Sequence, residues 1–274
     1  MTYREALKTA VNQLKNAQVP NAEYDAKELL LFVSGMTLSD WLMRASEQIP
    51  AGIFNAYAEL IGRRAGREPL QQITGVQEFM GLSFHVTKDT LCPRQDTEVL
   101  VETAIPFCNG ADVLDMCTGT GCIAVSLKLL GKAAKVTAAD ISAAALSVAK
   151  TNAEQNGADI LFLESDMFER IGEHYDVIVS NPPYIDAKQM KELMPEVREY
   201  EPALALYGGE DGLTFYRILT EEGIKHLNKG GYLIVEIGYD QADRVSELFR
   251  NAGLSEVKVI KDYAGNDRVV VGHL

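Results

Sequence analysis

From residue 112 onward the chain alternates short apolar strand patterns with helical patterns, and this alternation constrains the fold more than any other feature. The expected strands lie near residues 111–116, 135–140, 159–164, 175–180 and 231–237. The expected helices lie near residues 122–131, 143–156, 213–228 and 240–252. Alternating strands and helices are typical of a parallel sheet with crossover helices, so the sequence predicts an α/β fold.

The last two predicted strands, at residues 256–260 and 268–272, are joined differently from the others. The segment between them, around Gly265 and Asn266, is far shorter than the roughly dozen residues that a parallel crossover needs. We therefore expect these two strands to be antiparallel neighbours.

Residues 1–74 have helical patterns, and we expect them to form a helical bundle domain. Thr2 and Glu5 have the spacing of a capping box, which marks the start of a first helix. The apolar residues that follow fall on one face of that helix: Leu7, Ala10, Val11 and Leu14.

A β-hairpin is expected to join the bundle to the α/β part of the chain. Apolar and polar side chains alternate around Gly81, a pattern typical of hairpin strands. We place this linker at residues 75–95 and the third domain at residues 96–274. Asp96 or Thr97 is the expected N-cap of the first helix of that domain.

The net charge of −13 is carried almost entirely by the second part of the chain. Residues 1–80 hold 8 Lys and Arg against 9 Asp and Glu, or −1, whereas the remainder holds 18 against 30, or −12. Because nucleic acid is bound largely by neutralising phosphates with Lys and Arg, this balance argues against duplex DNA as the main partner. We expect the basic run of Arg63, Arg64 and Arg67 to be a solvated helix face rather than a contact for an acidic partner.

The sequence has no apolar run long enough to cross a membrane and no signal-peptide pattern at its start, so we expect a cytoplasmic protein. The four histidines are scattered, and the four cysteines form no Cys-x-x-Cys pair. A metal site is therefore not expected, and the thiols are expected to be reduced.

A glycine-rich loop, residues 115–121, follows the first predicted strand and runs directly into a helix. Glycines allow a tight turn and a close approach of a ligand. Asp140 ends the second predicted strand, 21 residues after Gly119, a spacing that suits a carboxylate accepting from ribose hydroxyls. Together these features predict an adenosine-containing cofactor, although the run Gly119-x-Gly121-x-x-Ala124 alone also fits a dinucleotide fingerprint.

The loop after the third predicted strand, residues 164–168, is placed to hold the adenine of such a cofactor. An acidic side chain there could accept from the adenine amino group while an apolar one covers the ring. The alternative is an ordinary acidic loop over an apolar plug.

The fourth predicted strand ends in the turn Asn181-Pro182-Pro183-Tyr184. Proline has no backbone N–H and holds the preceding residue extended, so this turn is stiff and presents mainly hydrogen-bond acceptors. The side-chain oxygen of Asn181 and the carbonyl of Pro182 could accept both hydrogens of a planar NH2 group while Tyr184 packs against its flat face. The nitrogen lone pair would then be free to attack. A proline-rich connection without a chemical role is the alternative.

The same turn distinguishes between two kinds of cofactor chemistry. A hydride-transfer enzyme needs a proton donor or acceptor near its substrate, and none is obvious at the later strand ends. The turn instead suits methyl transfer from S-adenosylmethionine to a nitrogen, in which catalysis depends on positioning and desolvation.

Nearly the whole chain resembles the bacterial N5-glutamine methyltransferases that modify the Gly-Gly-Gln tripeptide of class 1 peptide chain release factors. The Asn-Pro-Pro-Tyr turn is shared with adenine and cytosine amino-methyltransferases, whereas the Pro-Arg linker segment and the amino-terminal helical domain are more specific to the glutamine enzymes. The resemblance is carried by Pro69-Leu70-Gln71-Gln72-Ile73-Thr74-Gly75, Phe79, Gly81, Pro93-Arg94, Thr97-Glu98, residues 115–121, Asp140, residues 181–185, residues 201–206, Gly212-Leu213 and Asp267-Arg268.

The resemblance implies a seven-stranded class I methyltransferase (Rossmann-like) sheet with an antiparallel last strand, and a helical domain that helps to bind the release factor. It implies S-adenosylmethionine as cofactor, a class 1 release factor as protein substrate, no membrane partner and a monomer. The implied cofactor contacts are Cys117, Thr118, Gly119, Thr120, Gly121, Asp140, Asp166, Met167 and Asn181. The implied catalytic residues are Asn181, Pro182 and Tyr184, which with Pro183 would hold the glutamine amide.

Three residues depart from the pattern of that family. Cys117 stands where glycine is expected, which is compatible with the turn only if its φ is below zero and its side chain points away from the cofactor. Gln95 replaces an expected proline in the linker. Met167 stands where a larger aromatic residue is common, so either Met167 or Phe168 is expected to cover the adenine.

Three competing functions explain less of the sequence. A nucleic-acid amino-methyltransferase would be expected to have a basic cleft, against the charge of −12. A nucleotide-binding dehydrogenase leaves the turn at residues 181–184 without a role. A methyltransferase fold kept only for binding would be expected to have lost Gly119, Asp140 or Asn181, and all three are present.

Overall fold

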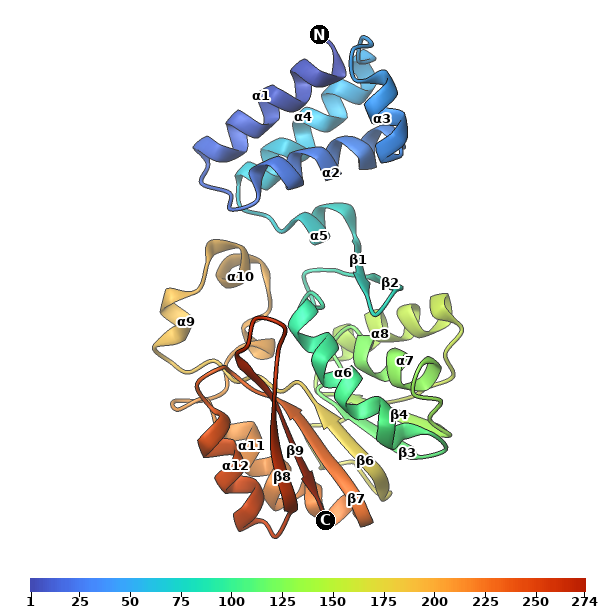
Figure 1. The fold of residues 1–274 in the computed structure, drawn as a ribbon, viewed down its shortest axis with the longest axis vertical. Coiled ribbons are helices and arrows are strands. Elements are labelled where there is room, and N and C mark those ends of the chain that lie inside the picture. The colour runs from blue at the N-terminus through green and yellow to red at the C-terminus, as the bar shows by residue number, and fades with distance from the viewer. The chain divides into compact units, whose positions relative to one another are not determined.

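The computed structural model describes all residues from 1 to 274, and the chain forms two compact units. One unit comprises Met1–Gly75 and Met194–Tyr200, and the other comprises Val76–Leu193 and Glu201–Leu274. Figure 1 shows the elements of both along the chain. The short segment of the first unit that comes from the second half of the sequence was not expected from the sequence. No helix in the structure is long and apolar enough to span a membrane.

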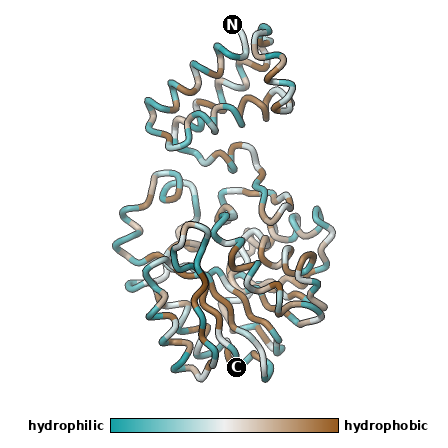
Figure 2. The backbone as a smooth tube through the Cα atoms, viewed as in Figure 1, coloured by the Kyte–Doolittle hydropathy of each residue, from teal (hydrophilic) through white to brown (hydrophobic).

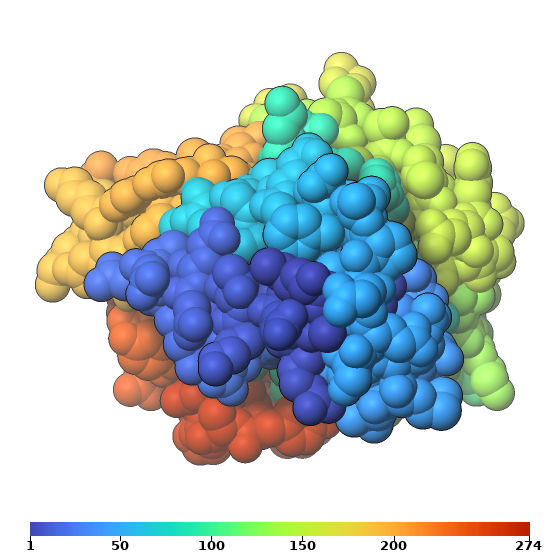
Figure 3. Space-filling model, turned by 90° about the horizontal axis from the view of Figure 1, so that it is seen from above, coloured from blue at the N-terminus to red at the C-terminus, as the bar shows by residue number.

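The first unit is a helical bundle, as the helical patterns predicted. Its core is built from fully buried apolar side chains, among them Leu14, Leu29 and Ile61. The predicted capping box is present: Glu5 N–H donates to Thr2 Oγ1 over 3.2 Å, and Thr2 N–H donates to Glu5 Oε2 over 2.8 Å. Figure 3 shows one face of the part formed by residues 1–65, in blue to cyan. The helices of the unit are α1 (Tyr3–Asn16), α2 (Ala22–Ser34), α3 (Leu38–Arg44), α4 (Ala51–Ala65), α5 (Leu70–Thr74) and α10 (Pro195–Tyr200).

The prediction that the basic run forms a solvated face is wrong for Arg64 and Arg67. Arg64 is buried, and its guanidinium donates to Asp25 Oδ2 over 2.8 Å and to Glu196 Oε1 over 3.0 Å. Arg67 binds the same Glu196 through two hydrogen bonds of 2.7 and 2.5 Å. Both acidic partners lie far from α4 in sequence, which is why the local pattern gave no sign of them. These contacts attach the segment with α10 to the bundle.

The second unit is an α/β domain built on a seven-stranded sheet, which confirms the predicted fold class. The strand order is β5-β4-β3-β6-β7-β9-β8. Strands β3 to β7 are parallel, while β9 is antiparallel to both β7 and β8, as the short connection between the last two strands predicted. The strands are β3 (Asp112–Met116), β4 (Lys135–Asp140), β5 (Leu161–Glu164), β6 (Tyr175–Ser180), β7 (Leu227–Glu236), β8 (Ser255–Lys261) and β9 (Asp267–His273).

Helices cover both faces of this sheet, and an apolar core fills each of the two spaces between helices and strands (Figures 1 and 2). One core packs against α6, α7 and α8, and the other against α11 and α12. The central strands are buried on both sides, which explains their continuous apolar runs. The helices of this unit are α6 (Gln95–Cys108), α7 (Cys122–Leu129), α8 (Ala143–Asn156), α9 (Gln189–Glu192), α11 (Thr214–Glu221) and α12 (Ala242–Asn251), with short 3₁₀ turns η1 (Ala203–Ala205) and η2 (Gly223–His226).

The expected hairpin is present as β1 (Val76–Phe79) paired antiparallel with β2 (Leu82–His85). The predicted N-cap of α6 is wrong, because that helix begins at Gln95 and neither Asp96 nor Thr97 caps it. Gln95 is exposed at the first helical position, where proline is common but not required, so its departure from the family pattern has no structural cost. Thr97 is buried instead and contacts Asn181.

Candidate active site

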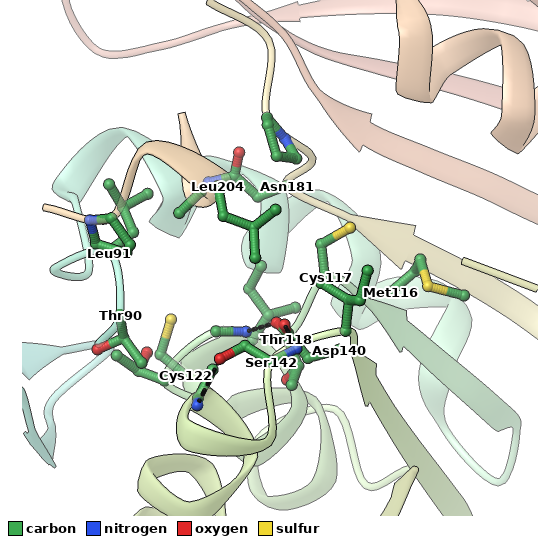
Figure 4. A pocket seen from close by; sticks show the side chains of 18 of the residues that line it. Thr90, Leu91, Met116, Cys117, Thr118, Cys122, Asp140, Ser142, Asn181 and Leu204 are labelled. Atoms are coloured by element: carbon green, nitrogen blue, oxygen red, sulfur yellow. Dashed lines mark hydrogen bonds between the residues drawn. The ribbon is translucent and has the colours of Figure 1, made fainter. Parts of the chain in front are cut away.

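A cavity of about 380 Å³ lies at the carboxyl ends of the parallel strands of the second unit. Strand β3 lies between β4 and β6, so chain connections diverge on either side of it. Open α/β sheets bind ligands at this kind of position. Figure 4 shows Asn181 and Leu204 on one side of the cavity and Thr118, Asp140 and Ser142 on the other.

All site residues predicted from the sequence line this cavity except Gly121, Pro182 and Tyr184. The lining residues come from the ends of four strands that are well separated in sequence. They are Cys117, Thr118, Gly119 and Thr120 after β3, Asp140 at the end of β4, Asp166 and Met167 after β5, and Asn181 and Pro183 after β6.

The two glycines of the loop after β3 have different roles in its geometry. Both have positive φ, +55° at Gly119 and +78° at Gly121. A Cβ on Gly121 would lie 3.0 Å from the Cβ of Ala149, so this glycine allows α7 and α8 to pack closely. A Cβ on Gly119 would meet no atom within 4 Å. Gly119 therefore leaves its backbone accessible to a ligand, whereas Gly121 is needed for the close packing of α7 and α8.

Asp115 holds the loop from beneath. Its Oδ2 accepts from Thr118 Oγ1 over 2.6 Å and from the backbone N–H of Ala124, in the first turn of α7, over 3.1 Å. The carboxyl group is fully buried, and its Oδ1 has no hydrogen-bond partner. Burial raises the pKa of Asp115 to about 7.

Asp140 is fixed by two backbone groups. Its Oδ2 accepts from Gly119 N–H and its Oδ1 from Ser142 N–H, each over 2.9 Å. Burial raises the pKa of this carboxyl, while those two N–H groups act in the opposite direction. A carboxylate can accept about four hydrogen bonds, so each oxygen retains capacity for a donor in the cavity.

Cys117 was expected to have a φ below zero and a side chain that points away from the cofactor, and the structure meets neither condition. Its φ is +64°, and the residue lines the cavity rather than pointing away from it. Met167 also has a positive φ, +44°, and the Sγ of Cys117 lies 3.9 Å from the Sδ of Met167. A left-handed conformation costs a non-glycine residue about 1–2 kcal/mol. Burial raises the pKa of the Cys117 thiol, which keeps it protonated.

Between the two candidates for covering a flat ring, only Met167 lines the cavity. The ring of Phe168 instead stacks on His226, with 5.4 Å between ring centroids and 11° between planes. A Cβ on Gly223 would lie 2.9 Å from the Phe168 ring, so Phe168 is held in a closely packed core. The sequence placed both residues in one loop but could not show which of them faced inward.

Asn181 has one half of its amide bound and the other half free. Its Nδ2 donates to Thr97 Oγ1 over 3.2 Å, and its Oδ1 accepts no hydrogen bond from the protein. Tyr184 turns away from the cavity, and its hydroxyl lies 3.4 Å from Glu236 Oε1. Burial raises the pKa of the Tyr184 phenol. Sequence reasoning gave no role to Glu236 and saw Thr97 only as a cap.

The site also contains residues from motifs that were noticed in the sequence but given no role. Arg94 Nη2 donates to both carboxylate oxygens of Glu201 over 2.7 Å, and Glu201 is almost fully buried. Leu204 and Ala205, from η1, and Phe215, from α11, complete an apolar part of the lining. Each of these residues is distant in sequence from the glycine loop, so only the fold brings them together.

The polar and apolar groups that line this cavity fit an adenosine-containing methyl donor. Its volume lies within the range of about 300–1,000 Å³ that is typical of ligand pockets. Asp140 has free acceptor capacity for hydroxyl groups, and the backbone at Gly119 is open. Ile123, Ile141 and Met167 supply apolar side chains for a flat ring.

Two family models match the chain. Residues 95–198 match the methyltransferase small domain, and residues 5–75 match the PrmC N-terminal domain. A solved methyltransferase from Pyrococcus furiosus has a TM-score of 0.55 and 21% sequence identity, covering 80% of this chain and 98% of that one. This similarity supports the methyltransferase fold. The methyltransferase family model, with the relatives described below, confirms S-adenosylmethionine as the cofactor.

Curated relatives match the chain from end to end. A release factor glutamine methyltransferase from Geobacter sulfurreducens is 41% identical over 100% of this chain and 97% of its own length. One from Cereibacter sphaeroides is 42% identical over 100% of this chain and 99% of its own length. With the sheet order, the glycine loop and the Asn-Pro-Pro-Tyr turn already described, these matches show that the chain belongs to the release factor glutamine methyltransferase family.

Proposed function

We propose that this protein transfers a methyl group from S-adenosylmethionine to the side-chain amide nitrogen, N5, of the glutamine in the Gly-Gly-Gln motif of class 1 peptide chain release factors. The family membership supports the reaction and the substrate. The observation that carries the proposal is the free Oδ1 of Asn181 on the cavity wall, an acceptor suited to an NH2 group.

The residues after β3, β4 and β5 are proposed to hold the cofactor, which supplies a methyl group on a positively charged sulfur when bound. Asp140 would accept from the ribose hydroxyls, and the open backbone of Gly119 would allow the close approach. Asp166 would accept from the adenine amino group, and Met167 would cover the ring. The other proposed contacts line the cavity and are Cys117, Thr118, Thr120 and Asn181.

The turn after β6 is proposed to hold the glutamine amide. Asn181 Oδ1 and the Pro182 carbonyl would accept one amide hydrogen each, which directs the nitrogen lone pair toward the methyl group. The nitrogen–methyl bond would form as the sulfur–methyl bond of the cofactor breaks, and the nitrogen would then lose one proton to water. No strong base is needed before the transfer, because orientation and desolvation of the amide lower the barrier. Pro183 stiffens the turn, and Tyr184, which does not line the cavity, is proposed to hold the turn in place through its hydrogen bond to Glu236.

The amino-terminal bundle is proposed to contribute to release-factor binding, and the chain to act as a cytoplasmic monomer. The charge of −12 over residues 81–274 disfavours the alternative of a nucleic-acid amino-methyltransferase, since phosphates would be repelled.

The test incubates the full-length protein with methyl-labelled S-adenosylmethionine and a class 1 release factor, and maps the label by mass spectrometry. The expected label lies on the glutamine of the Gly-Gly-Gln motif. A release factor with glutamate in place of that glutamine is the matched control and should remain unlabelled. Label on a nucleic-acid base in a parallel incubation, with none on the release factor, would refute the proposal.

Asn181→Ala supplies a second test at the level of the site. It should lower kcat by about 100-fold while changing cofactor affinity little, because the proposed loss is an acceptor for the substrate amide. Unchanged turnover would remove Asn181 from the mechanism.

A further inference from the structure

We propose that Glu236 is a positioning residue that fixes, through Thr97, which way the side-chain amide of Asn181 faces. The inference rests on the proposed function, because it explains how the protein presents an acceptor rather than a donor to the glutamine amide. Neither residue was given a role in the site from the sequence: Glu236 ends β7, and Thr97 lies in the first turn of α6.

Burial restricts what these two side chains can contact. Glu236 is 2% exposed and Thr97 is 3% exposed, so neither has water as a ready partner. Strand β7 runs beside β6, with Val235 paired to Ser180, which brings Glu236 to the strand end that carries Asn181. Thr97 and Asn181 therefore line the cavity, with the buried Glu236 close behind them.

The hydrogen bonds at Thr97 leave one donor without a partner. Thr97 Oγ1 accepts from Asn181 Nδ2 over 3.2 Å, and its own proton has no acceptor among the hydrogen bonds of the structure. Glu236 Oε1 accepts from the Tyr184 hydroxyl over 3.4 Å, while the buried Oε2 has no hydrogen-bond partner. Burial raises the pKa of this carboxyl group, and the Thr97 hydroxyl acts in the opposite direction. In the proposed network, the unused donor of Thr97 binds the unused acceptor of Glu236; both side chains are buried at this strand end.

This arrangement determines the orientation of the Asn181 amide. A hydroxyl has a single proton, so a Thr97 that donates to Glu236 can only accept from Asn181. The NH2 half of Asn181 must then face Thr97, and Oδ1 is left for the cavity. If the orientation were reversed, Nδ2 would face the NH2 group of the substrate, donor against donor.

Protonation of Glu236 would reverse the direction of the chain of hydrogen bonds. A neutral carboxyl group can donate to Thr97, which frees the Thr97 proton to bind Asn181 Oδ1 and turns the amide over. Burial raises the pKa of Glu236 to about 7, so the ionised form that favours activity predominates above that pH and is lost below it. The charged and titratable groups that face Glu236 are Asp96 in α6, Cys122 in α7, Tyr184, Tyr216 in α11 and Arg268 in β9.

The kinetic test compares Glu236→Gln with wild type and with Glu102→Gln, an exposed site on α6 outside the cavity. Glutamine matches glutamate in shape, and when its carbonyl oxygen keeps the hydrogen bond from the Tyr184 hydroxyl, its NH2 group donates to Thr97 at every pH. We expect kcat to fall by about 10- to 100-fold at pH 8 in Glu236→Gln, with KM for the cofactor within about two-fold of wild type, and no change in Glu102→Gln. The fall of kcat below about pH 7 in wild type should be absent from Glu236→Gln. Wild-type kcat in Glu236→Gln at pH 8 would overturn the inference.

Two variants of Thr97 separate the hydroxyl from the packing of the side chain. Thr97→Ser keeps the hydroxyl and should retain most of kcat, whereas Thr97→Val keeps the shape and should match Glu236→Gln. Equal losses in both variants, with cofactor binding intact by calorimetry, would refute the role of the hydroxyl.

A readout without turnover uses the side-chain amide signal of Asn181 in ¹⁵N-labelled protein, assigned by its loss in Asn181→Asp. It should shift with a midpoint near pH 7 in wild type and not in Glu236→Gln. A pH-independent signal in wild type would overturn the inference. If wild type methylates no glutamine but the signal titrates as expected, the proposed function fails and the positioning network stands.

Discussion

Replacing Arg64 with methionine should destabilise the helical bundle strongly. Methionine fills much of the volume of the arginine stem, so the main loss is charge and hydrogen bonding. Asp25, whose side chain is only 7% exposed, has Arg64 as its sole side-chain partner and would become an unpaired buried carboxylate. Glu196 would keep both of its hydrogen bonds from Arg67. Removing one partner of a buried ion pair costs about 3–5 kcal/mol, and the isolated Asp25 places Arg64→Met in that range.

The assay is urea unfolding of the full chain, monitored by hydrogen exchange of backbone amides in α2 and α4. These amides report on the bundle itself. With a slope of about 1–3 kcal/mol per molar urea, the loss should lower the midpoint of the bundle transition by about 1 M or more. Arg64→Met combined with Asp25→Leu should recover most of the stability, because it removes the orphaned charge. A loss below about 1 kcal/mol in the single variant, or no recovery in the double variant, would refute this reasoning.

Three further predictions concern the loop and its carboxylates. Asp140→Ala should weaken cofactor binding by about 10-fold or more, since it removes the proposed ribose acceptor and the anchor of Gly119; an unaltered dissociation constant by calorimetry would contradict this. Cys117→Gly should change the free energy of unfolding by no more than about 1 kcal/mol, because relief of the positive φ offsets lost thiol packing, whereas Cys117→Val should cost about 2 kcal/mol or more in thermal or denaturant unfolding. Burial raises the pKa of Asp115 from its ordinary 3.8 to about 7, so the stability contributed by its protonated form is present below about pH 4 and is lost as pH rises through 7. The stability of wild type relative to Asp115→Asn should therefore increase as pH falls from 8 to 4, and a constant difference would show that Asp115 does not titrate in this range.

The sequence predicted the parts of the fold that depend on local patterns. Apolar runs located the strands of the sheet, and the short connection near Gly265 correctly predicted the antiparallel pair β8 and β9. The glycine loop, Asp140 and Asn181 were placed correctly on one edge of the sheet because the carboxyl ends of parallel strands lie together.

The errors arise where a side chain finds a partner far away in sequence. Arg64 was assigned to solvent because its partner Glu196 lies 132 residues away. Thr97 was assigned to a cap because the alternative partner, Asn181, comes 84 residues later. The positive φ of Cys117 was not expected. A left-handed backbone is unfavourable for cysteine, so a negative φ was the natural expectation, and the sequence does not show the folded loop that imposes the positive value. Spacing along the chain contains no information on such contacts.

The segment from Met194 to Tyr200 has a consequence for how the protein can be divided. The chain passes between the two units at three peptide bonds, after Gly75, after Leu193 and after Tyr200. A truncation that removes the first 75 residues would leave Glu196 without Arg64 and Arg67. The segment Met194–Tyr200 would then be exposed, without the helices to which it is bound. The bundle is thus unsuited to removal or exchange as a detachable module, and a chimera between relatives would need to exchange both pieces together.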